Sequence, residues 1–297
     1  MERIENPLKT VTCPAQTVCG GCDFLGLPLQ DQLNRKQEEL SSLLSRRSVT
    51  FPSISVWSPG SHALRDRLDF TLEDGRFGLR HKSERRIVDL SECPQLSPAL
   101  HRWFLEFRAR LPKVAKGSVR LRVSPEGLRG MWLDLSNIDI KNLMDEAAWL
   151  NSWPETVVIE MGQRRKFLKR SASGRPHLED PVFHPWFETR WRENRVSLYG
   201  QVGSFTQPSL VANRRIGGWI QSAVLDVRPR RITEFGAGQG NLSFPALSGD
   251  AHLTVCENDR SALAGFEKSL EVLFSEKNID LRDRVTIEAG DFLRKSS

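Results

Sequence analysis

Residues 231–241 read RITEFGAGQGN, and this stretch indicates the fold class of the C-terminal third of the chain. Residues 231–235 suit a short strand, residues 236–240 carry three glycines, and residues 241–247 suit the start of a helix. Glycines let the backbone of a strand-to-helix turn approach a ligand closely, and the first N–H groups of the helix can donate to it. A glycine-rich turn alone does not specify which ligand binds.

The segments around this turn alternate between helix and strand. We expect a helix before the turn, then a strand, a helix and a strand after it, over residues 209–227, 253–256, 260–274 and 285–288. Together with the strand at 231–235, this βαβαβ order predicts a parallel, Rossmann-like sheet.

Residues 50–200 have a different pattern, in which short alternating segments such as 68–72 and 118–123 indicate half-buried strands. The Asp-Gly pair within residues 73–76 predicts a hairpin turn. We expect helices over residues 100–111 and 140–150, and a loop over 174–185. The region is therefore predicted to be a β-rich domain with helices lying against its sheet.

The N-terminal residues form a cysteine- and glycine-rich loop, 13–22, and then a predicted helix with leucines at helical spacing over residues 29–44. The sequence thus predicts an α/β protein in three parts. Residues 1–49 hold the loop and helix, residues 50–200 form the β-rich α+β central domain, and residues 201–297 form the N-terminal part of a Rossmann-like domain.

Acidic residues end two of the predicted parallel strands. Glu257 follows Asn241 by sixteen residues, and Asp291 follows the last strand. An acidic side chain at the first position can accept hydrogen bonds from both ribose hydroxyls of a nucleoside, and Asp291 is placed to meet an adenine amino group. Because the glycines do not form a GxGxxG motif, S-adenosylmethionine is favoured over NAD. For Glu257 taken alone, a solvated strand end is the alternative.

Four of the five cysteines form a pattern. Cys13, Cys19 and Cys22 have the spacing C-x5-C-G-G-C, and Cys93 follows after a long gap. Thiolates at this spacing can converge on one soft metal site, and four thiolates suit either zinc or an iron–sulfur cluster. We favour a 4Fe–4S cluster, with zinc or isolated core cysteines as alternatives. Radical chemistry is disfavoured, since the spacing is not C-x3-C-x2-C and a fourth cysteine leaves no open iron.

The charge balance suits a polyanionic partner such as RNA. The formal net charge is +6, and basic residues gather in the stretches 65–86 and 164–170. Acidic residues interleave the first stretch, so part of it can be an ordinary solvated face. We find no apolar run long enough to span a bilayer and no secretory signal, and we expect a cytoplasmic, monomeric protein without a membrane partner.

The chain resembles the iron–sulfur-containing branch of the RNA uridine-5-methyltransferase family over nearly its whole length. The similar segments are the cysteine loop, the arginine-rich 64–70 (LRDRLDF), the fourth-cysteine segment 88–94 (VDLSECP), and 203–208 (GSFTQP), which resembles the family's SFxQ signature. The resemblance implies a methyltransferase that uses S-adenosylmethionine to form 5-methyluridine in RNA, with ribosomal RNA favoured over transfer RNA.

By resemblance, the methyl donor contacts Gln207, Gly236, Asn241, Glu257 and Asp291. Phe205 is expected near the RNA base, with Arg65 and Arg67 as further RNA-contacting residues. The four cysteines are implied to hold the cluster.

The family's catalytic segments do not occur in residues 1–297. We find no Asp-Pro-Pro-Arg segment, no Ser-Cys-Asn nucleophile motif and no general-base glutamate near a C-terminus. Cys256 lies inside a predicted strand and is expected to be core. We therefore expect the nucleophile and base beyond Ser297 and a 297-residue chain without activity of its own. The alternatives are a non-catalytic RNA-binding relative with a four-cysteine metal site, and a zinc-stabilised methyltransferase acting on another substrate.

Overall fold

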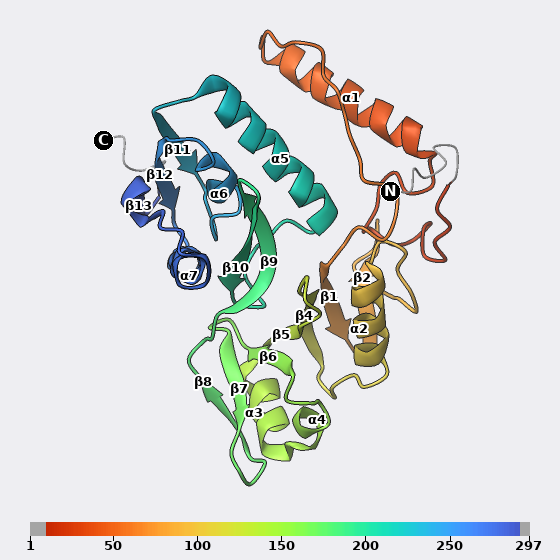
Figure 1. Cartoon of the computed structure of the whole chain (residues 1–297). Coiled ribbons are helices and arrows are strands. Elements are labelled where there is room, and N and C mark those ends of the chain that lie inside the picture. Colours follow the sequence, from red (N-terminus) through yellow and green to blue (C-terminus); the bar gives the residue numbers. More distant parts are fainter. Residues whose placement is uncertain (1–9, 292–297) are drawn as a thin grey trace.

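The computed structural model describes residues 10–291, which form three sheets with helices packed against them (Figure 1). The largest sheet has eight strands in the order β3-β2-β1-β4-β5-β6-β7-β8. Its strands are β1 (Arg67–Glu73), β2 (Arg76–Arg80), β3 (Ile87–Asp89), β4 (Lys116–Val123), β5 (Arg129–Leu135), β6 (Val157–Met161), β7 (Lys166–Arg170) and β8 (Pro176–Glu179).

The β1–β2 hairpin turns at Asp74 and Gly75, both with positive φ, and Glu73 pairs with Arg76 across it. Two central residues with φ above zero are what a two-residue hairpin turn requires, so the predicted turn is confirmed. Helix α2 (Pro98–Arg108) begins at Ser97, whose hydroxyl accepts from the Leu100 amide, and covers this part of the sheet. The core between them is rich in buried aromatic residues, namely Phe70, Phe77, Trp103, Phe104, Phe107 and Trp153.

The parallel sheet has the predicted βαβαβ order, with β11 (Arg231–Phe235), β12 (His252–Glu257) and β13 (Val285–Ala289) in sequence order. Helices α5 (Leu210–Val227), α6 (Ser243–Ala246) and α7 (Arg260–Lys277) connect and flank these strands, and a short 3-10 turn, Arg282–Arg284, precedes β13. Ser209 caps α5 and Asp259 caps α7 through side-chain oxygens. The predicted Rossmann-like unit is therefore confirmed.

A third sheet, the hairpin of β9 (His184–Trp191) and β10 (Asn194–Gly200), packs on the parallel unit. Phe187, Val196 and Leu198 of this hairpin share a buried core with Phe244 and Phe266. Trp186 of the same hairpin and Val202 instead pack with Val158 of the central sheet, in a small core of their own.

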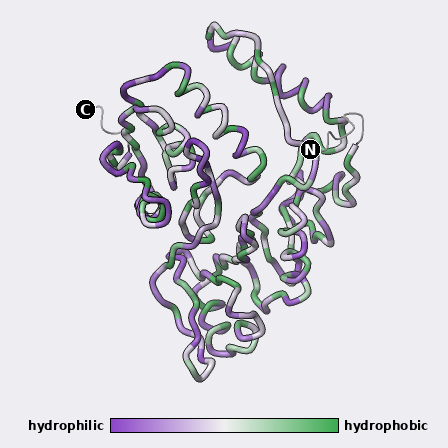
Figure 2. Tube along the Cα trace, viewed as in Figure 1, coloured by the Kyte–Doolittle hydropathy of each residue, from purple (hydrophilic) through white to green (hydrophobic). Residues whose placement is uncertain are grey.

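Helix α1 (Leu29–Arg46) confirms the predicted N-terminal helix and contains no buried residue. Figure 2 shows hydrophilic and hydrophobic residues alternating along it. None of the helices between residues 10 and 291 combines the length and apolar character that crossing a bilayer requires.

Three element predictions need correction. The helix expected over 140–150 is divided into α3 (Asn137–Glu146) and α4 (Ala148–Asn151), because Ala147 adopts a left-handed conformation with φ 52°. The loop expected over 174–185 contains β8, since pairing with β7 outweighs the local proline and glycine signals. The helix expected over 241–247 is reduced to α6, a single turn that contains Pro245, which has no N–H to donate.

Candidate functional site

The glycine turn after β11 keeps open space above its backbone. Gly236, Gly238 and Gly240 all have positive φ. A Cβ atom added to Gly236 or Gly238 would meet no atom within 4 Å, whereas one added to Gly240 would lie 2.2 Å from the Phe266 ring. Gly240 is therefore required by packing, while the first two glycines leave room for a ligand.

A pocket of about 90 Å³ lies between this turn and the segment 205–207. Phe205 and Gln207 line one side, and Gly236, Gly238 and Asn241 line the other. The structure thus brings together four of the residues that the sequence predicted for one site, from segments about thirty residues apart. Thr189, on the neighbouring hairpin, donates to the Asn241 carbonyl and so fixes this end of the turn.

Glu257 holds the turn from the end of β12. Its carboxylate accepts a 2.7 Å hydrogen bond from the Gly238 amide, and further bonds from the amides of Asn258 and Asp259 at 2.7 and 2.8 Å. The Gly290 amide donates to the Glu257 carbonyl at 2.9 Å, which places Asp291 at the adjacent strand end. The two predicted acidic residues therefore lie at neighbouring carboxyl ends of parallel strands, where ligands of open α/β sheets bind.

Glu234 also lines the pocket, and the sequence prediction missed it. Burial raises the pKa of its carboxyl to about 7, while a 2.6 Å hydrogen bond from the Ser243 hydroxyl acts in the opposite direction. Nearby Glu257 raises it further. Its position before the glycine turn was the signal that could have identified it.

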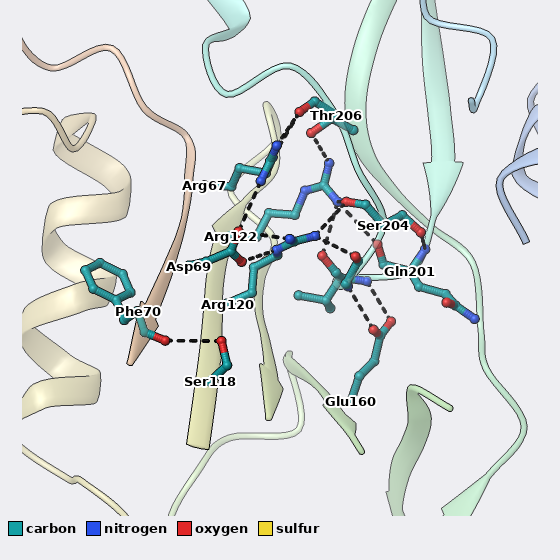
Figure 3. Close-up of polar contacts among 12 residues, drawn as sticks. Arg67, Asp69, Phe70, Ser118, Arg120, Arg122, Glu160, Gln201, Ser204 and Thr206 are labelled. Carbon is teal, nitrogen blue, oxygen red and sulfur yellow. Dashed lines mark hydrogen bonds and ion pairs between the residues drawn. The ribbon is translucent and has the colours of Figure 1, made fainter. Parts of the chain in front are cut away.

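Three arginines of the central sheet hold the segment 201–206 that carries Phe205 (Figure 3). Arg122 is 1% exposed and donates to the carbonyls of Gln201, Val202 and Ser204 and, at 2.6 Å, to the Thr206 hydroxyl. Arg120 donates to the Gly203 and Ser204 carbonyls, and Arg67 to the Thr206 carbonyl. Charged donors to carbonyl acceptors make strong bonds, so the segment is fixed to the sheet at several points.

Glu160 of β6 completes this arrangement from the opposite side. Its carboxylate accepts hydrogen bonds from the amides of Val202 and Gly203, at 2.7 and 3.0 Å. Burial raises the pKa of Glu160 to about 7, against the lowering effect of these two amides. Sequence reasoning named neither Arg122 nor Glu160, because nothing in their local sequence shows that they meet residues 201–206.

The predicted RNA-contacting residues are found in two places. Phe205 is 71% exposed, and the Arg67 guanidinium lies 5.0 Å from the centre of its ring. The Arg67 side chain is only 11% exposed, and its guanidinium also lies 3.6 Å from the Asp69 carboxylate. The inner face of the Phe205 ring therefore packs on a nearly buried arginine. Burial and nearby Arg120 lower the pKa of Arg67 to about 10. Arg65 instead lines the cysteine pocket.

The four cysteines line one pocket of about 130 Å³, together with Arg65. The loop that carries Cys13, Cys19 and Cys22 docks on the end of β2, where the Gly20 amide donates to the Arg80 carbonyl. A side chain at Gly20 would lie 3.0 Å from that carbonyl oxygen, which explains the glycine.

The pocket holds one buried thiol, that of Cys93, and three partly buried ones. Burial raises the pKa of the Cys93 thiol to about 11. It also raises the pKa of Cys22, although the Arg65 guanidinium acts to lower it. The cysteines form no disulfide. Among residues 10–291, no group of three or more His, Cys, Asp or Glu side chains is arranged so that it could hold a metal ion.

The comparisons with known proteins agree with this fold. No family model matches the chain. An uncharacterized RNA methyltransferase of Bdellovibrio bacteriovorus is 45% identical over 289 residues, which cover 97% of this chain and 74% of that protein. The 23S rRNA (uracil(1939)-C(5))-methyltransferase of Halomonas elongata is 25% identical, over 89% of this chain and 57% of that protein.

Among solved structures, the tRNA (uracil-54, C5)-methyltransferase of Pyrococcus abyssi, in complex with S-adenosyl-L-homocysteine, matches with a TM-score of 0.64. The match covers 96% of this chain and 66% of that one at 16% identity, and it shows the fold. The chain thus has a mixed α/β, methyltransferase-like fold. The chain belongs to a family of RNA methyltransferases, that of the Bdellovibrio relative.

Proposed function

We propose that the chain binds S-adenosylmethionine between segment 205–207 and the glycine turn, as part of an enzyme that forms 5-methyluridine in RNA. The observation that carries the proposal is the meeting of Phe205 and Gln207 with Gly236 and Asn241 in one pocket. The chain spans about three quarters of the Bdellovibrio relative and 57% of the Halomonas relative, so the activity of the whole protein is part of the proposal.

In this proposal the donor nucleoside lies along the carboxyl ends of β12 and β13. The Glu257 carboxylate accepts from the ribose hydroxyls, and its bonds with the amides of Asn258 and Asp259 fix its orientation. Asp291, one residue beyond the strand-end bond between Gly290 and Glu257, accepts from the adenine amino group. The methionine part of the donor then extends over Gly236 and Gly238, where the backbone leaves open space.

The target uracil approaches from the side of Phe205. Carbon 5 of uracil is a weak nucleophile, and a thiolate added to carbon 6 makes it enolate-like. Carbon 5 then attacks the sulfonium methyl group, and a base removes the carbon 5 hydrogen to release the enzyme. Phe205 is exposed above Arg67 and presents an aromatic face on which a base can stack once it has left its own stack.

The nucleophile and the base are proposed to lie outside residues 1–297. Cys256 is buried within β12, and the other four cysteines line the separate pocket at the end of β2. The second candidate function is RNA binding without catalysis, and it is favoured by the lack of a cysteine among the described residues that line the donor pocket. Under either function the ribosomal substrate is favoured by the Halomonas relative, while a Wolinella succinogenes tRNA/tmRNA (uracil-C(5))-methyltransferase, 24% identical, represents the transfer RNA alternative.

We further propose that Cys13, Cys19, Cys22 and Cys93 hold a 4Fe–4S cluster, with zinc as the alternative occupant. The support is that all four side chains line one pocket, three of them from a loop that glycines allow to wrap closely. When bound, the cluster would tie the cysteine loop to the Cys93 segment, a structural role, since four cysteines leave no iron open to substrate.

Photolabelling tests the proposed donor site. Irradiation of the chain with S-adenosylmethionine carrying a tritiated methyl group should label peptides that contain residues 203–208 or 236–241. Excess S-adenosylhomocysteine should abolish the label, and NAD should not. Labelling of other peptides, or protection by NAD, would contradict the proposal.

A further inference from the structure

A second exposed aromatic cluster lies away from the donor pocket, where the connection between α1 and β1 runs past α5 (Figure 1). The rings of Trp57 and Trp219 meet edge to face, with centroids 6.1 Å apart. The Arg215 guanidinium lies 5.7 Å from one ring centre and 5.2 Å from the other. Trp57 is 38% exposed and Trp219 48% exposed, so the faces of two large rings are open to solvent around one cation.

The polar groups of this cluster are available for a partner. The indole N–H groups of Trp57 and Trp219 make no hydrogen bond within residues 10–291. The Arg215 guanidinium makes neither a hydrogen bond nor an ion pair there. The adjacent Arg214, by contrast, is bonded to the Glu188 carboxylate at 2.6 Å. Arg215 therefore presents a planar set of donors, of the kind that binds phosphate in two-point contacts.

The two segments that form the cluster contain no acidic residue. Residues 40–65 include Arg46, Arg47 and Arg65 but no Asp or Glu, and residues 194–225 are likewise free of carboxylates. In a chain with 37 acidic residues, two adjoining segments without carboxylates favour a positive potential around Arg215, although Glu38 and Glu39 precede the first segment and Asp226 follows the second. Exposed aromatic faces in a positive surface suit a polyanion with unpaired bases.

The cluster also lies on the helix that leads away from the donor pocket. The Asp66 amide donates to the Pro208 carbonyl, and the Asp66 carboxylate accepts from the Leu210 amide, so the start of α5 is fixed beside Gln207. Arg215 and Trp219 follow roughly 8 and 14 Å along the helix axis, one turn apart from each other. An RNA strand whose target base stands at Phe205 can thus continue along α5.

We propose that Trp57, Arg215 and Trp219 form a stacking surface that binds an unpaired segment of the RNA beside the target uridine. The inference rests on the proposed function for the identity of the RNA, and adds where a neighbouring stretch of it binds. One or two bases stack on the indole faces, and Arg215 pairs with a backbone phosphate. Duplex RNA is a poor ligand for this surface, because its bases are stacked and paired inside the helix.

The test measures binding of fluorescently labelled single-stranded and duplex uridine-containing RNA to the chain by anisotropy. Trp219→Ala is expected to weaken single-strand binding about tenfold, the effect of losing a stacked base. Trp219→Phe, which keeps an aromatic face, should stay within about threefold of the original affinity. Arg215→Ala should weaken binding and reduce the salt dependence by about one phosphate contact.

Phe274→Ala provides a matched control, because Phe274 is a 39% exposed ring with the Arg282 guanidinium 4.5 Å from its centre. That arginine is bonded to Asp280 and lies in acidic surroundings, so this variant should bind RNA unchanged. Thermal unfolding of each variant checks that the connection between α1 and β1 stays in place.

The outcomes separate this inference from the proposed function, which the donor photolabelling tests without RNA. Loss of single-strand binding in Trp219→Ala, with Trp219→Phe and Phe274→Ala unaffected, supports the stacking surface whatever the donor result. Equal affinity of Trp219→Ala and the unaltered chain, equal loss in Phe274→Ala, or no RNA binding by the unaltered chain would overturn it.

Discussion

The guanidinium of Arg122, buried in the central sheet, donates a 2.6 Å hydrogen bond to the hydroxyl of Thr206, the residue before Gln207. Arg122 is paired in register with Arg67 across β1 and β4, and both arginines donate to the segment 201–206. Two adjacent cations are tolerated here because backbone carbonyls face them. The central sheet thereby positions one wall of the donor pocket.

Replacement of Arg122 by Met should disorder this wall. The variant removes the Arg122 hydrogen bonds to the carbonyls of Gln201, Val202 and Ser204 and to the Thr206 hydroxyl, and we expect the free energy of unfolding to fall by about 3 kcal/mol. Urea denaturation measures the change. Arg231→Met, at an exposed arginine of β11, removes the same charge and should cost under about 0.5 kcal/mol. Equal costs in the two variants would show that the Arg122 contacts contribute nothing.

Glu160 makes stability depend on pH. Its folded pKa is about 7, above the ordinary value of 4.5, so between these values the folded state holds a proton that the unfolded state has released. The contribution of Glu160 to the free energy of unfolding is therefore fully present below pH 4.5 and is lost as the pH rises to about 7. The total loss is about 3 kcal/mol. Glu160→Gln should remove this part of the slope, and Glu267→Gln, at an exposed glutamate, should not. Parallel pH profiles for the original chain and Glu160→Gln, from urea unfolding, would refute the assignment.

Gly240 should be the least replaceable glycine of the turn. Alanine there combines a φ of +82° with a Cβ atom 2.2 Å from the Phe266 ring, and we expect a loss of about 3 kcal/mol or more in the free energy of unfolding. Gly174→Ala is the control, since its φ is +77° and its Cβ would meet nothing within 4 Å. It should cost only about 1 kcal/mol. Similar unfolding curves for the two variants would show that the Phe266 ring can move away from the new Cβ atom without loss of stability.

Cysteine replacement tests the proposed cluster. Anaerobic reconstitution of the chain with iron and sulfide should give about four iron atoms per chain. Cys19→Ser should lower this content and also reduce solubility and RNA affinity. Cys256→Ser changes a cysteine of β12 outside the pocket and should leave the iron content as it was. Zinc in place of iron in protein purified without oxygen, or full iron content in Cys19→Ser, would count against a 4Fe–4S cluster.

Local patterns were sufficient to predict the parallel unit and the hairpin at Asp74 and Gly75. Helical periodicity, capping residues such as Ser209 and the glycine turn all act within a few residues, and the structure confirms them. The approach of Gln207 to the glycine turn could be expected only from resemblance.

Contacts between distant segments could not be predicted in the same way. Arg122 meets residues about 80 positions away, and Glu160 residues about 40 away, so their roles depend on which strands neighbour each other in the eight-stranded sheet. The same reason explains Arg65, which lies two residues from Arg67 but lines the cysteine pocket. Strand β8 was not predicted because its strand conformation depends on hydrogen bonds to β7, which its own residues do not reveal.

The proposed donor site is tested most directly by isothermal titration calorimetry, in which S-adenosylhomocysteine is added to the chain and to its Glu257→Gln variant. An amide cannot accept from the Gly238 amide and from two ribose hydroxyls as a carboxylate does, so the variant should bind at least about tenfold more weakly. Glu267→Gln, on the exposed side of α7, should bind like the original chain. Binding by the original chain with this pattern is the predicted result; equal affinity in all three proteins, or no binding by the original chain, would contradict the proposed donor site.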